Sequence, residues 1–461
     1  MDISIILAAG EGTRMKSKKS KVLHTLLNKT MISYVLDASV EAGAAKNVII
    51  AGKNRAFLEE KIQEENVSFK TQEIGEGIPY GTGYAVSLAL EEIADDDTVL
   101  ILTGDIPLIT GKTLKSFVDY HKDYKSIATV LTATIEDPTG YGRVVKDEQG
   151  NMLKIVEHKD CSEEELEIKE FNSGIMALQG KALKDSISKL DTDNEQGELY
   201  LTDIFEILRE EGGNISTFLI DDVEEVYGIN SKLQLAEAEK IMKRRVNEKF
   251  MIDGVVMEDP ERTFIEPGVE IGRDTYIGSG VRIFGKTKIG ESCEIFGDSF
   301  IKDSILDDEV VIKSSYIIES EIGEGTDVGP FSHLRPNSKL GKHVHIGDFV
   351  EIKKSTVGDG TKAGHLAYLG DVDLGENINI SCGVIFANYD GKNKARTKVG
   401  SGSFIGSNAN IVAPCEIEEE AYIAAGSTIT KAVKKGELAI ERGTQANIAG
   451  WVDKRKKNGK L

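Results

Sequence analysis

Cysteine is scarce in this chain. The 461 residues contain four, at positions 161, 293, 382 and 415, and no two of them have CxxC spacing. Cysteines scattered in this way predict reduced, mostly buried thiols in a cytosolic protein. They also argue against a zinc site formed from thiolates, which needs closely spaced ligands.

Basic charge is also in deficit, since 56 Lys and Arg residues stand against 77 Asp and Glu, for a net charge of -21. General nucleic-acid binding depends on a broad basic surface that displaces counterions, so this balance argues against a nucleic-acid partner. Small anions are not excluded, because a local basic pocket can bind them within an acidic protein.

Long apolar runs are missing as well. No segment approaches the ~20 apolar residues that span a bilayer, so we expect no membrane insertion. The N-terminal run Ile3 to Ala9 is too short for the apolar region of a signal peptide, follows Asp2 instead of basic residues and leads straight into Gly10. The sequence therefore predicts a cytoplasmic protein, long enough for two or three domains.

What the C-terminal half does contain is a strict period of six. Isoleucine recurs at 265, 271, 277, 283, 289, 295 and 301, and apolar residues resume the same spacing over 322–352 and 399–429. This period differs from that of a helix or a flat strand, and it indicates one short strand and one turn per repeat. We predict a left-handed parallel β-helix of hexapeptide repeats with these side chains pointing inward.

The N-terminal half alternates apolar strands with helix-like segments, among them 31–41 and 84–93. This alternation predicts an α/β domain of the Rossmann-like type, with a mostly parallel sheet and helices on both faces. Ligands of such sheets bind at the carboxyl ends of the strands, which places the site near Gly10 and Asp105. The expected domains are 1–229 and 252–461, joined by a connecting helix over 230–251.

The first strand is followed by Gly10 and Gly12, where exposed backbone N–H groups can approach phosphate oxygens. The pattern is neither a Walker A motif nor GxGxxG, and a plain tight turn explains the glycines equally well. Arg14 and Lys21 favour the functional interpretation, because they can place positive charge where a nucleotidyl transfer develops negative charge.

The segment Leu7 to Met15, LAAGEGTRM, resembles the signature of nucleotide-sugar pyrophosphorylases. Further motifs occur in the order of that family: Lys21-Val-Leu-His, Gly81-Thr-Gly, Gly104-Asp-Ile-Pro, Gly140-Tyr-Gly-Arg, Ile155-Val-Glu-His-Lys, Asn172-Ser-Gly and Tyr200-Leu-Thr-Asp. One departure is a longer spacer between Gln72 and Gly81. Combined with the β-helix, the whole chain resembles the bifunctional N-acetylglucosamine-1-phosphate uridyltransferase/glucosamine-1-phosphate acetyltransferases.

The resemblance implies a reaction in the N-terminal domain: UTP and N-acetylglucosamine 1-phosphate give UDP-N-acetylglucosamine, a peptidoglycan and lipopolysaccharide precursor, and pyrophosphate. Arg14 and Lys21 would be catalytic, and Asp105 with Asn230 would hold Mg²⁺, which accepts hard oxygen ligands. The residues that would bind UTP and the sugar nucleotide are Leu7, Ala8, Ala9, Gly10, Lys21, Gln72, Gly81, Thr82, Gly140, Glu157, Asn172 and Asn230.

The six-residue period slips at 353–364 and is interrupted at 387–398 by a stretch rich in Asn, Lys and Arg. Insertions in solenoids often line a binding site, although a tolerated surface loop is an equal alternative. Among seven histidines, His365 is the candidate general base, because imidazole can deprotonate an amine that attacks a thioester near neutral pH. A structural role for this histidine remains the alternative.

In the C-terminal domain the resemblance implies acetyl transfer from acetyl-CoA to glucosamine 1-phosphate, in a homotrimer with sites between subunits. The acetyl acceptor would be bound by Arg335, Lys353, Tyr368, Asn379 and Lys394. Acetyl-CoA would be bound by Asn388, Tyr389, Ser407, Ala425 and Arg442. The basic run 454–457 is expected to be solvated. Alternatively, it attracts the phosphates of coenzyme A, with Trp451 as a stacking surface.

Two alternatives remain open at the level of sequence. The β-helix could serve only for oligomerisation or regulation of a pyrophosphorylase, or it could be a structural or zinc-binding scaffold. His343 and His345 favour the zinc version, because residues two apart on a strand share a face. Their neighbour Ile346 is an inward position, so these histidines are expected to face solvent or a turn.

Overall fold

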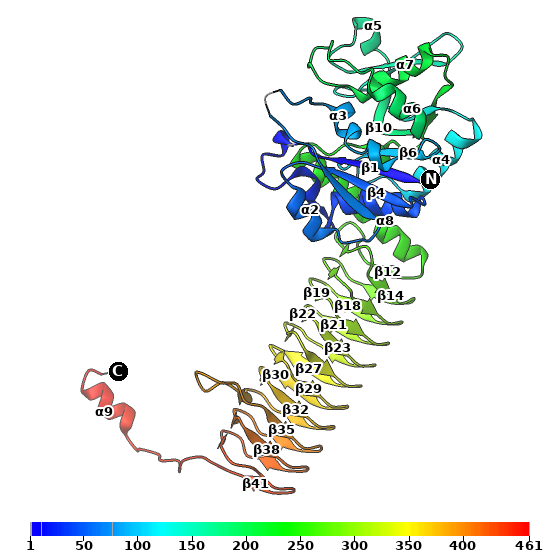
Figure 1. The fold of residues 1–461 in the computed structure, drawn as a ribbon. Helices are drawn as coiled ribbons and strands as arrows, with labels where there is room; N and C mark the ends of the chain where they lie inside the picture. The colour runs from blue at the N-terminus through cyan, green and yellow to red at the C-terminus, as the bar shows by residue number, and fades with distance from the viewer. Residues whose placement is uncertain (1, 11, 76, 461) are drawn as a thin grey trace. The chain divides into compact units, whose positions relative to one another are not determined.

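The computed structural model describes residues 2–10, 12–75 and 77–460, and it divides into two compact units, residues 1–242 and 243–461. Figure 1 shows that one unit is an α/β fold and the other is a stack of β-coils. Both predicted fold classes are confirmed. Within the described ranges no helix is long and apolar enough to cross a membrane.

The α/β unit is built on a nine-stranded sheet with β1 Ile3–Ala8 near its centre. Parallel pairing joins β1 to β4 Lys46–Ala51 and to β6 Thr98–Thr103, whereas β10 Glu170–Gln179 runs antiparallel to β6. The remaining strands are β5 Val67–Thr71, β7 Ala128–Thr134, β8 Arg143–Lys146, β9 Met152–Val156 and β11 Ile215–Leu219. The sheet is mostly parallel, as predicted.

Helices cover both faces of this sheet. Ile6 and Ala8 of β1 pack on one face with α1 Met31–Glu41, α2 Arg55–Lys61 and α4 Gly111–Asp123. Ile3 and Ile5 pack on the other face with α3 Thr82–Ser87, α6 Gly180–Ile187 and α7 Ile204–Glu210. Alternate β1 side chains therefore enter two separate cores, which explains its unbroken apolar sequence.

The helix predicted over 84–93 is shorter in the structure. Helix α3 ends at Ser87, and a separate 3-10 turn covers Leu90–Glu92. The Ser87 hydroxyl donates a 2.7 Å hydrogen bond to the carbonyl of Tyr84. Serine bonded back to its own helix in this way offers the backbone an alternative to continued helix, and the helix ends there.

In the second unit three parallel sheets form the sides of a left-handed β-helix. Sheet I runs from β12 Val256–Met257 to β41 Leu438–Ala439, sheet II from β13 Phe264–Ile265 to β40 Thr428–Ile429, and sheet III from β14 Glu270–Ile271 to β38 Cys415–Ile417. Figure 1 shows these coils stacked in chain order. The seven isoleucines of the predicted repeat lie in one core, where six are buried and Ile271 is partly buried.

The coil length varies almost entirely at one corner. Inward residues are always six apart where sheet III leads into sheet I. Where sheet I leads into sheet II they are also six apart, except for one five-residue step from Ile312 to Ile317. Every other irregularity from Ile265 to Val433 lies where sheet II leads into sheet III, including the 13-residue step from Phe386 to Val399. The two predicted interruptions thus lie at the same corner.

Helix α8 Lys232–Ile252 links the units, and the division between them falls within it. Its last turns cap the β-helix, because Val246 and Phe250 pack against the core and the Asn247 amide donates to the carbonyls of Pro260 and Thr263 at 2.7 and 3.0 Å. At the other end, residues 440–460 are almost entirely exposed and contain α9 Trp451–Lys457.

Candidate functional sites

The loop after β1 and the turn after β6 meet at the carboxyl end of the sheet. The backbone N–H of Gly104 donates a 2.9 Å hydrogen bond to the carbonyl of Leu7, and a Cβ on Gly104 would lie 3.1 Å from that oxygen. Glycine at 104 therefore lets the turn approach the strand closely. This approach places Asp105 beside the Gly10 loop, where the strand pattern predicted a site.

A cluster of three polar side chains lies at this point. The Lys21 ammonium donates to Asp105 Oδ2 at 2.5 Å and to Asn230 Oδ1 at 2.9 Å. The Lys21 and Asp105 side chains are only 14% and 17% exposed. Asn230 is brought here because the Ile229 N–H donates to the Asp105 carbonyl at 2.9 Å. A carboxylate oxygen and an amide oxygen thus converge on one cation.

Gly12 packs against Lys21 and helps to position its side chain. It adopts the left-handed conformation with φ +60°, and a Cβ there would lie 2.7 Å from the Lys21 Cβ. The bare backbone of the loop therefore packs directly on the lysine side chain. Arg14 lies in the adjoining 3-10 turn Thr13–Met15 and is exposed to solvent.

Tyr141 also borders this cluster, and sequence reasoning did not select it. A Cβ on Gly228 would lie 3.6 Å from Asn230 Nδ2, 3.9 Å from the Tyr141 hydroxyl and 4.0 Å from Asp105 Oδ2, so all three surround that glycine. Burial raises the pKa of Tyr141 and the Asp105 charge adds to the rise, whereas a Gly228 backbone hydrogen bond and Arg14 oppose it. Its position inside the Gly140-Tyr-Gly-Arg motif was the available signal.

The predicted uridine-binding residues follow β4 and β5. Gln72 is 7% exposed, and its N–H donates to the Ala51 carbonyl at 2.7 Å. Gly81, with φ +118°, packs against the segment at 199, where a Cβ would lie 2.5 Å from the Leu199 carbonyl oxygen. The Thr82 hydroxyl accepts a 3.0 Å hydrogen bond from the Leu201 N–H. This pair is therefore fixed by the backbone across from it.

The predicted sugar-binding residues come from β10 and from the loops around β8 and β9. Asn172 lies at a bulge in β10, and its Oδ1 accepts a 2.8 Å hydrogen bond from the Gly174 N–H. Glu157 accepts a 3.2 Å hydrogen bond from the Thr202 hydroxyl, and burial raises the pKa of Glu157. Gly140 is exposed and has φ +88°.

The Gly10 loop also borders a cavity of 810 Å³. Ala9 and Gly10 line it together with Asn54, Phe57 and the lysines Lys18, Lys19, Lys53 and Lys61. Asn54 anchors the loop, since its Nδ2 donates to the Ala8 carbonyl at 3.1 Å and to the Ser20 hydroxyl at 2.9 Å. The loop is therefore held against a basic hollow in an otherwise acidic protein.

In the β-helix three cations gather where sheet II leads into sheet III. Arg335 follows β25 His333–Leu334, Lys353 ends β28 Glu351–Lys353, and Lys394 comes from the 387–398 insertion. The neighbouring Lys394 ammonium lowers the pKa of Lys353, and burial and Arg335 lower it further, whereas Asp371 opposes them. The three charges are close enough to repel one another, which an anion would relieve.

Polar groups on the following coils extend this cluster. Lys353 pairs with Gly370 across neighbouring strands, and a Cβ on Gly370 would lie 2.5 Å from the Tyr368 hydroxyl. On the next coil the buried Asn388 amide donates to Asp371 Oδ2 at 2.5 Å. Arg335, Lys353, Tyr368, Asn388 and Lys394 therefore share one corner.

His365 lies at a different corner, where sheet I leads into sheet II. Its Nδ1 is 2.8 Å from Asp348 Oδ1, and its side chain is 68% exposed. Two further predicted residues, Ser407 and Ala425, occupy the same place two residues after the inward Ile405 and Ile423. The Gly426 N–H donates to the Ser407 carbonyl, and Arg442 Nη1 donates to that of Ala425 at 3.3 Å.

Cys382 occupies the equivalent place on the coil between His365 and Ser407, two residues after the inward Ile380. All four cysteines are free thiols, but Cys382 is exposed and Cys161 is only partly buried. The expectation of mostly buried thiols is therefore wrong for Cys382, because its place in the coil points outward.

Two predicted residues lie apart from these groups. Asn379 is exposed on β33 Asn379–Ile380 of sheet I, where its Nδ2 donates to the Ser381 hydroxyl at 3.2 Å. Tyr389 is 58% exposed in the insertion and pairs with Lys394 through an isolated bridge. His345 faces outward, and its Nδ1 is 2.8 Å from Asp327 Oδ2.

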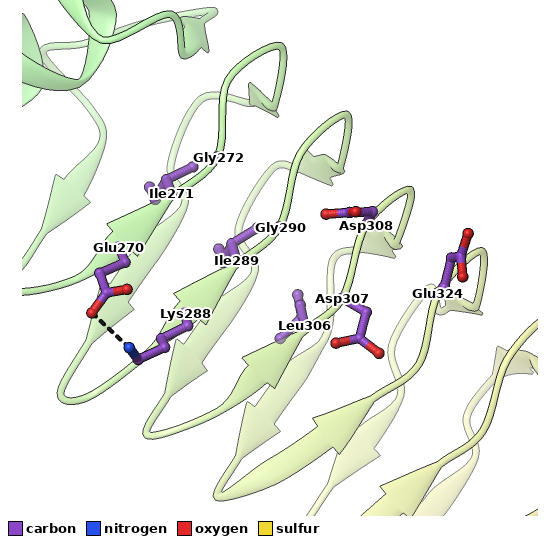
Figure 2. A pocket seen from close by; sticks show the side chains of 10 residues that line it. All are labelled: Glu270, Ile271, Gly272, Lys288, Ile289, Gly290, Leu306, Asp307, Asp308 and Glu324. Carbon is purple, nitrogen blue, oxygen red and sulfur yellow. Dashed lines mark ion pairs between the residues drawn. The ribbon is translucent and has the colours of Figure 1, made fainter.

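A separate groove on the β-helix has the opposite charge. Figure 2 shows Glu270, Asp307, Asp308 and Glu324 around it, with Glu270 paired to Lys288. Its volume is 490 Å³. A groove with four carboxylates and one lysine disfavours anionic substrates, so it does not compete with the Arg335 cluster as a phosphate site.

Comparison with known proteins agrees with both units. A nucleotidyl transferase family model matches residues 3–224, a model of the GMPPB C-terminal domain matches 256–357, and the bacterial transferase hexapeptide model, with six repeats, matches 396–431.

Relatives extend the likeness over almost the full length. The bifunctional protein GlmU of Clostridioides difficile (strain 630) is 48% identical over 98% of this chain and 97% of its own. The GlmU proteins of Clostridium beijerinckii (strain ATCC 51743 / NCIMB 8052) and Clostridium botulinum (strain ATCC 19397 / Type A) are 47% and 45% identical, each over 98% of both chains. The chain therefore belongs to the GlmU family of bifunctional uridyltransferase/acetyltransferases, enzymes of UDP-N-acetylglucosamine synthesis.

Proposed function

We propose that the two activities of this family lie in separate units of the chain. Uridylyl transfer takes place at the Lys21, Asp105 and Asn230 cluster, and acetyl transfer takes place beside His365. The observation that carries the proposal is the convergence of the Asp105 and Asn230 oxygens on one cation. The cation cluster around Lys353 supports a second, separate anion site.

In the N-terminal unit, a phosphate oxygen of N-acetylglucosamine 1-phosphate attacks the α-phosphorus of UTP. A P–O bond forms, the bond to the β-phosphate breaks, and pyrophosphate leaves. Lys21 and Arg14 offset the negative charge that develops during this displacement. No general base is required, because the attacking phosphate is already anionic.

Asp105 and Asn230 are suited to hold Mg²⁺. Both offer hard oxygen ligands, and the Lys21 ammonium between them shows that the two oxygens can share a cation. No group of three or more His, Cys, Asp or Glu side chains within 2–10, 12–75 and 77–460 could form a complete metal cage. Water and substrate phosphates would therefore complete the coordination. The metal, when bound, neutralises phosphate charge during transfer.

The remaining predicted residues divide between the two halves of the product. The uridine would lie against Leu7, Ala8, Ala9 and Gly10 on one side and against Gln72, Gly81 and Thr82 on the other. The amino sugar would contact Gly140, Glu157 and Asn172. The close packing of Gly81 on Leu199 and the Gly174 bond to Asn172 support these roles, because both fix the groups before substrate arrives.

In the C-terminal unit, His365 Nε2 takes a proton from the amine of glucosamine 1-phosphate as the nitrogen attacks the thioester carbonyl of acetyl-CoA. An amide bond forms, the C–S bond breaks, and the protonated imidazole returns the proton to the departing sulfur, so that coenzyme A leaves as the free thiol. Arg335 and Lys353 bind the sugar phosphate, and Tyr368, Asn379 and Lys394 bind the sugar. Acetyl-CoA contacts Asn388, Tyr389, Ser407, Ala425 and Arg442.

A homotrimer in the cytoplasm is the expected state of the enzyme. Three large apolar side chains, Phe331, Phe349 and Leu366, are 61%, 57% and 57% exposed beside His365, and the two phenylalanine rings stack at 5.6 Å. Apolar clusters exposed in this way favour contact with another subunit. A sedimentation measurement that gave a monomer would contradict this assembly.

Two variants test the assignment of the two activities. Lys21→Ala should reduce pyrophosphate release by roughly 10²–10³-fold while release of free thiol continues. His365→Ala should reduce thiol release by roughly 10²–10⁴-fold while uridylyl transfer continues. If either folded variant lost both activities, two independent sites would be ruled out. If wild-type protein released no thiol, the β-helix would have only an oligomerising or regulatory role.

A further inference from the structure

We propose that Asp348 is the positioning residue of His365. Its carboxylate accepts the hydrogen bond from Nδ1 and leaves Nε2 free to take the proton of the attacking amine. This inference rests on the role of His365 in the proposed function. The Nδ1 to Oδ1 distance is 2.8 Å, and the two residues pair across neighbouring coils.

The β-helix register brings the two side chains together. Asp348 ends β27 His345–Asp348 and His365 ends β30 Lys362–His365, each two residues after an inward residue, Ile346 or Ala363. The Leu366 N–H donates to the Asp348 carbonyl at 2.9 Å, which fixes the backbone just beyond the pair. Both side chains therefore leave the coil on the same outward side.

The residues before the pair allow the coils to approach closely. Gly347 and Gly364 face each other, and a Cβ on Gly347 would overlap the carbonyl oxygen of Gly364. Glycine at 347 thus keeps β27 and β30 close enough for Asp348 to reach His365.

A carboxylate partner makes an exposed histidine a better base by fixing its tautomer. Imidazole has two neutral tautomers, and only the one protonated on Nδ1 presents a free lone pair on Nε2. An ionised carboxylate can only accept hydrogen bonds, so it selects this tautomer and also stabilises the imidazolium formed when Nε2 is protonated. The hydrogen bond from His365 holds the pKa of Asp348 below its usual value, which keeps this carboxyl ionised at neutral pH.

A second His–Asp pair on the same sheet provides a matched control. His345 Nδ1 is 2.8 Å from Asp327 Oδ2, and both side chains are again partly exposed. Neither residue belongs to the proposed binding or catalytic groups. Asp327→Asn therefore removes a comparable carboxylate–imidazole contact without touching His365.

The test uses full-length Asp348→Asn, whose amide can donate to Nδ1 and so favours the wrong tautomer. We expect kcat for acetyl transfer to fall by roughly 10- to 100-fold, a part of what a positioned base contributes. The KM values for acetyl-CoA and glucosamine 1-phosphate should stay within about twofold, because Asp348 is not among the residues proposed to bind either substrate. A calorimetric transition of the β-helix unit unchanged from wild type reports that this unit is folded, and Asp327→Asn should retain full acetyl transfer.

A double-mutant cycle separates positioning from other roles. If Asp348 acts only through His365, Asp348→Asn or Asp348→Ala should cause no further loss in a His365→Ala background. A further tenfold loss there, or a raised KM with unchanged kcat in the single variant, would overturn the inference. A wild-type kcat in Asp348→Asn would also overturn the inference. The base assignment is tested separately, and a strong loss of acetyl transfer in His365→Ala supports it. Full activity of His365→Ala would instead remove the base assignment itself.

Discussion

Asp203 is a partly buried carboxyl that should weaken the N-terminal unit at neutral pH. Burial raises the pKa of Asp203 to about 6 from 3.8, and the nearby charges of Asp191, Glu157, Glu206 and Asp160 contribute to the rise. The folded state therefore favours the protonated form more than the unfolded state does. By linkage, the free energy of unfolding falls as the pH rises from about 4 to about 6 and stays at its lower level above that range.

The size of this loss follows from the pKa difference. A rise from 3.8 to about 6 corresponds to about 3 kcal/mol of preference for the protonated form. Because Asp203 is only partly buried, solvent screening reduces the figure to about 1.5 kcal/mol. An asparagine side chain at this position would mimic the protonated acid at every pH, so Asp203→Asn should stabilise the unit by about 1.5 kcal/mol at pH 8.

Differential scanning calorimetry of the intact chain measures the effect. The N-terminal transition is the one that UTP with Mg²⁺ raises, because a ligand stabilises the unit that binds it. For a unit of 242 residues, Asp203→Asn should raise this transition by about 3–6 °C at pH 8. The gain should be about half as large at pH 5 and disappear near pH 4. The control Asp119→Asn, at an exposed position of α4, should leave the N-terminal transition temperature unchanged at each pH.

The gain must depend on pH for the reasoning to hold. An equal gain at pH 5 and pH 8 would show that the asparagine acts through packing or hydrogen bonding, and a loss at pH 8 would show that the ionised carboxylate is stabilising.

Two further predictions concern the other candidate residues. Gly81→Ala would place a Cβ 2.5 Å from the Leu199 carbonyl oxygen at a residue with positive φ. It should therefore destabilise the N-terminal unit by about 2–4 kcal/mol and impair uridylyl transfer alone. Gly150→Ala is the calorimetric control, because Gly150 also has positive φ but has open space around its Cβ position. Lys353→Ala should raise the KM for glucosamine 1-phosphate roughly 10- to 100-fold with little change in kcat, because it removes a proposed phosphate contact. An unchanged KM in initial-rate assays would contradict that role. The control is Lys339→Ala, which removes an exposed ion pair with Glu321.

The fold could be predicted because its signals are periodic. Burial requires an apolar side chain at every sixth residue of a β-helix, and the isoleucines from 265 to 301 display that requirement directly. Between Ile301 and Ile322 the core continues, but its residues are five or six apart, so the period is lost in the sequence while the coil is retained. The predicted end of the helix over 84–93 was wrong for a local reason. The Ser87 hydroxyl bonds to the carbonyl of Tyr84 in its own helix, and the apolar periodicity does not reveal such a bond.

The sites were only partly predictable. Resemblance supplied residues such as Lys21 and His365, but the partners that orient them come from other strands. Asp348 precedes His365 by one coil, so its proximity depends on the local coil length of 17 residues. Tyr141 meets Asp105 only because the chain returns at Gly228. Knowledge of the register would have revealed Asp348, whereas Tyr141 required the tertiary fold.

The position of the insertion explains how a regular solenoid acquires a binding corner. Inward residues cannot change their spacing within a strand without exposing the core, so chain length can vary only at corners. In this β-helix nearly all of that variation lies where sheet II leads into sheet III. The 387–398 insertion therefore emerges on the side of the coil where Lys353 already ends its strand, and it brings Lys394 against it. Two like charges held together in this way cost free energy, which the nearby Asp371 offsets only in part, so the corner favours the binding of a phosphate.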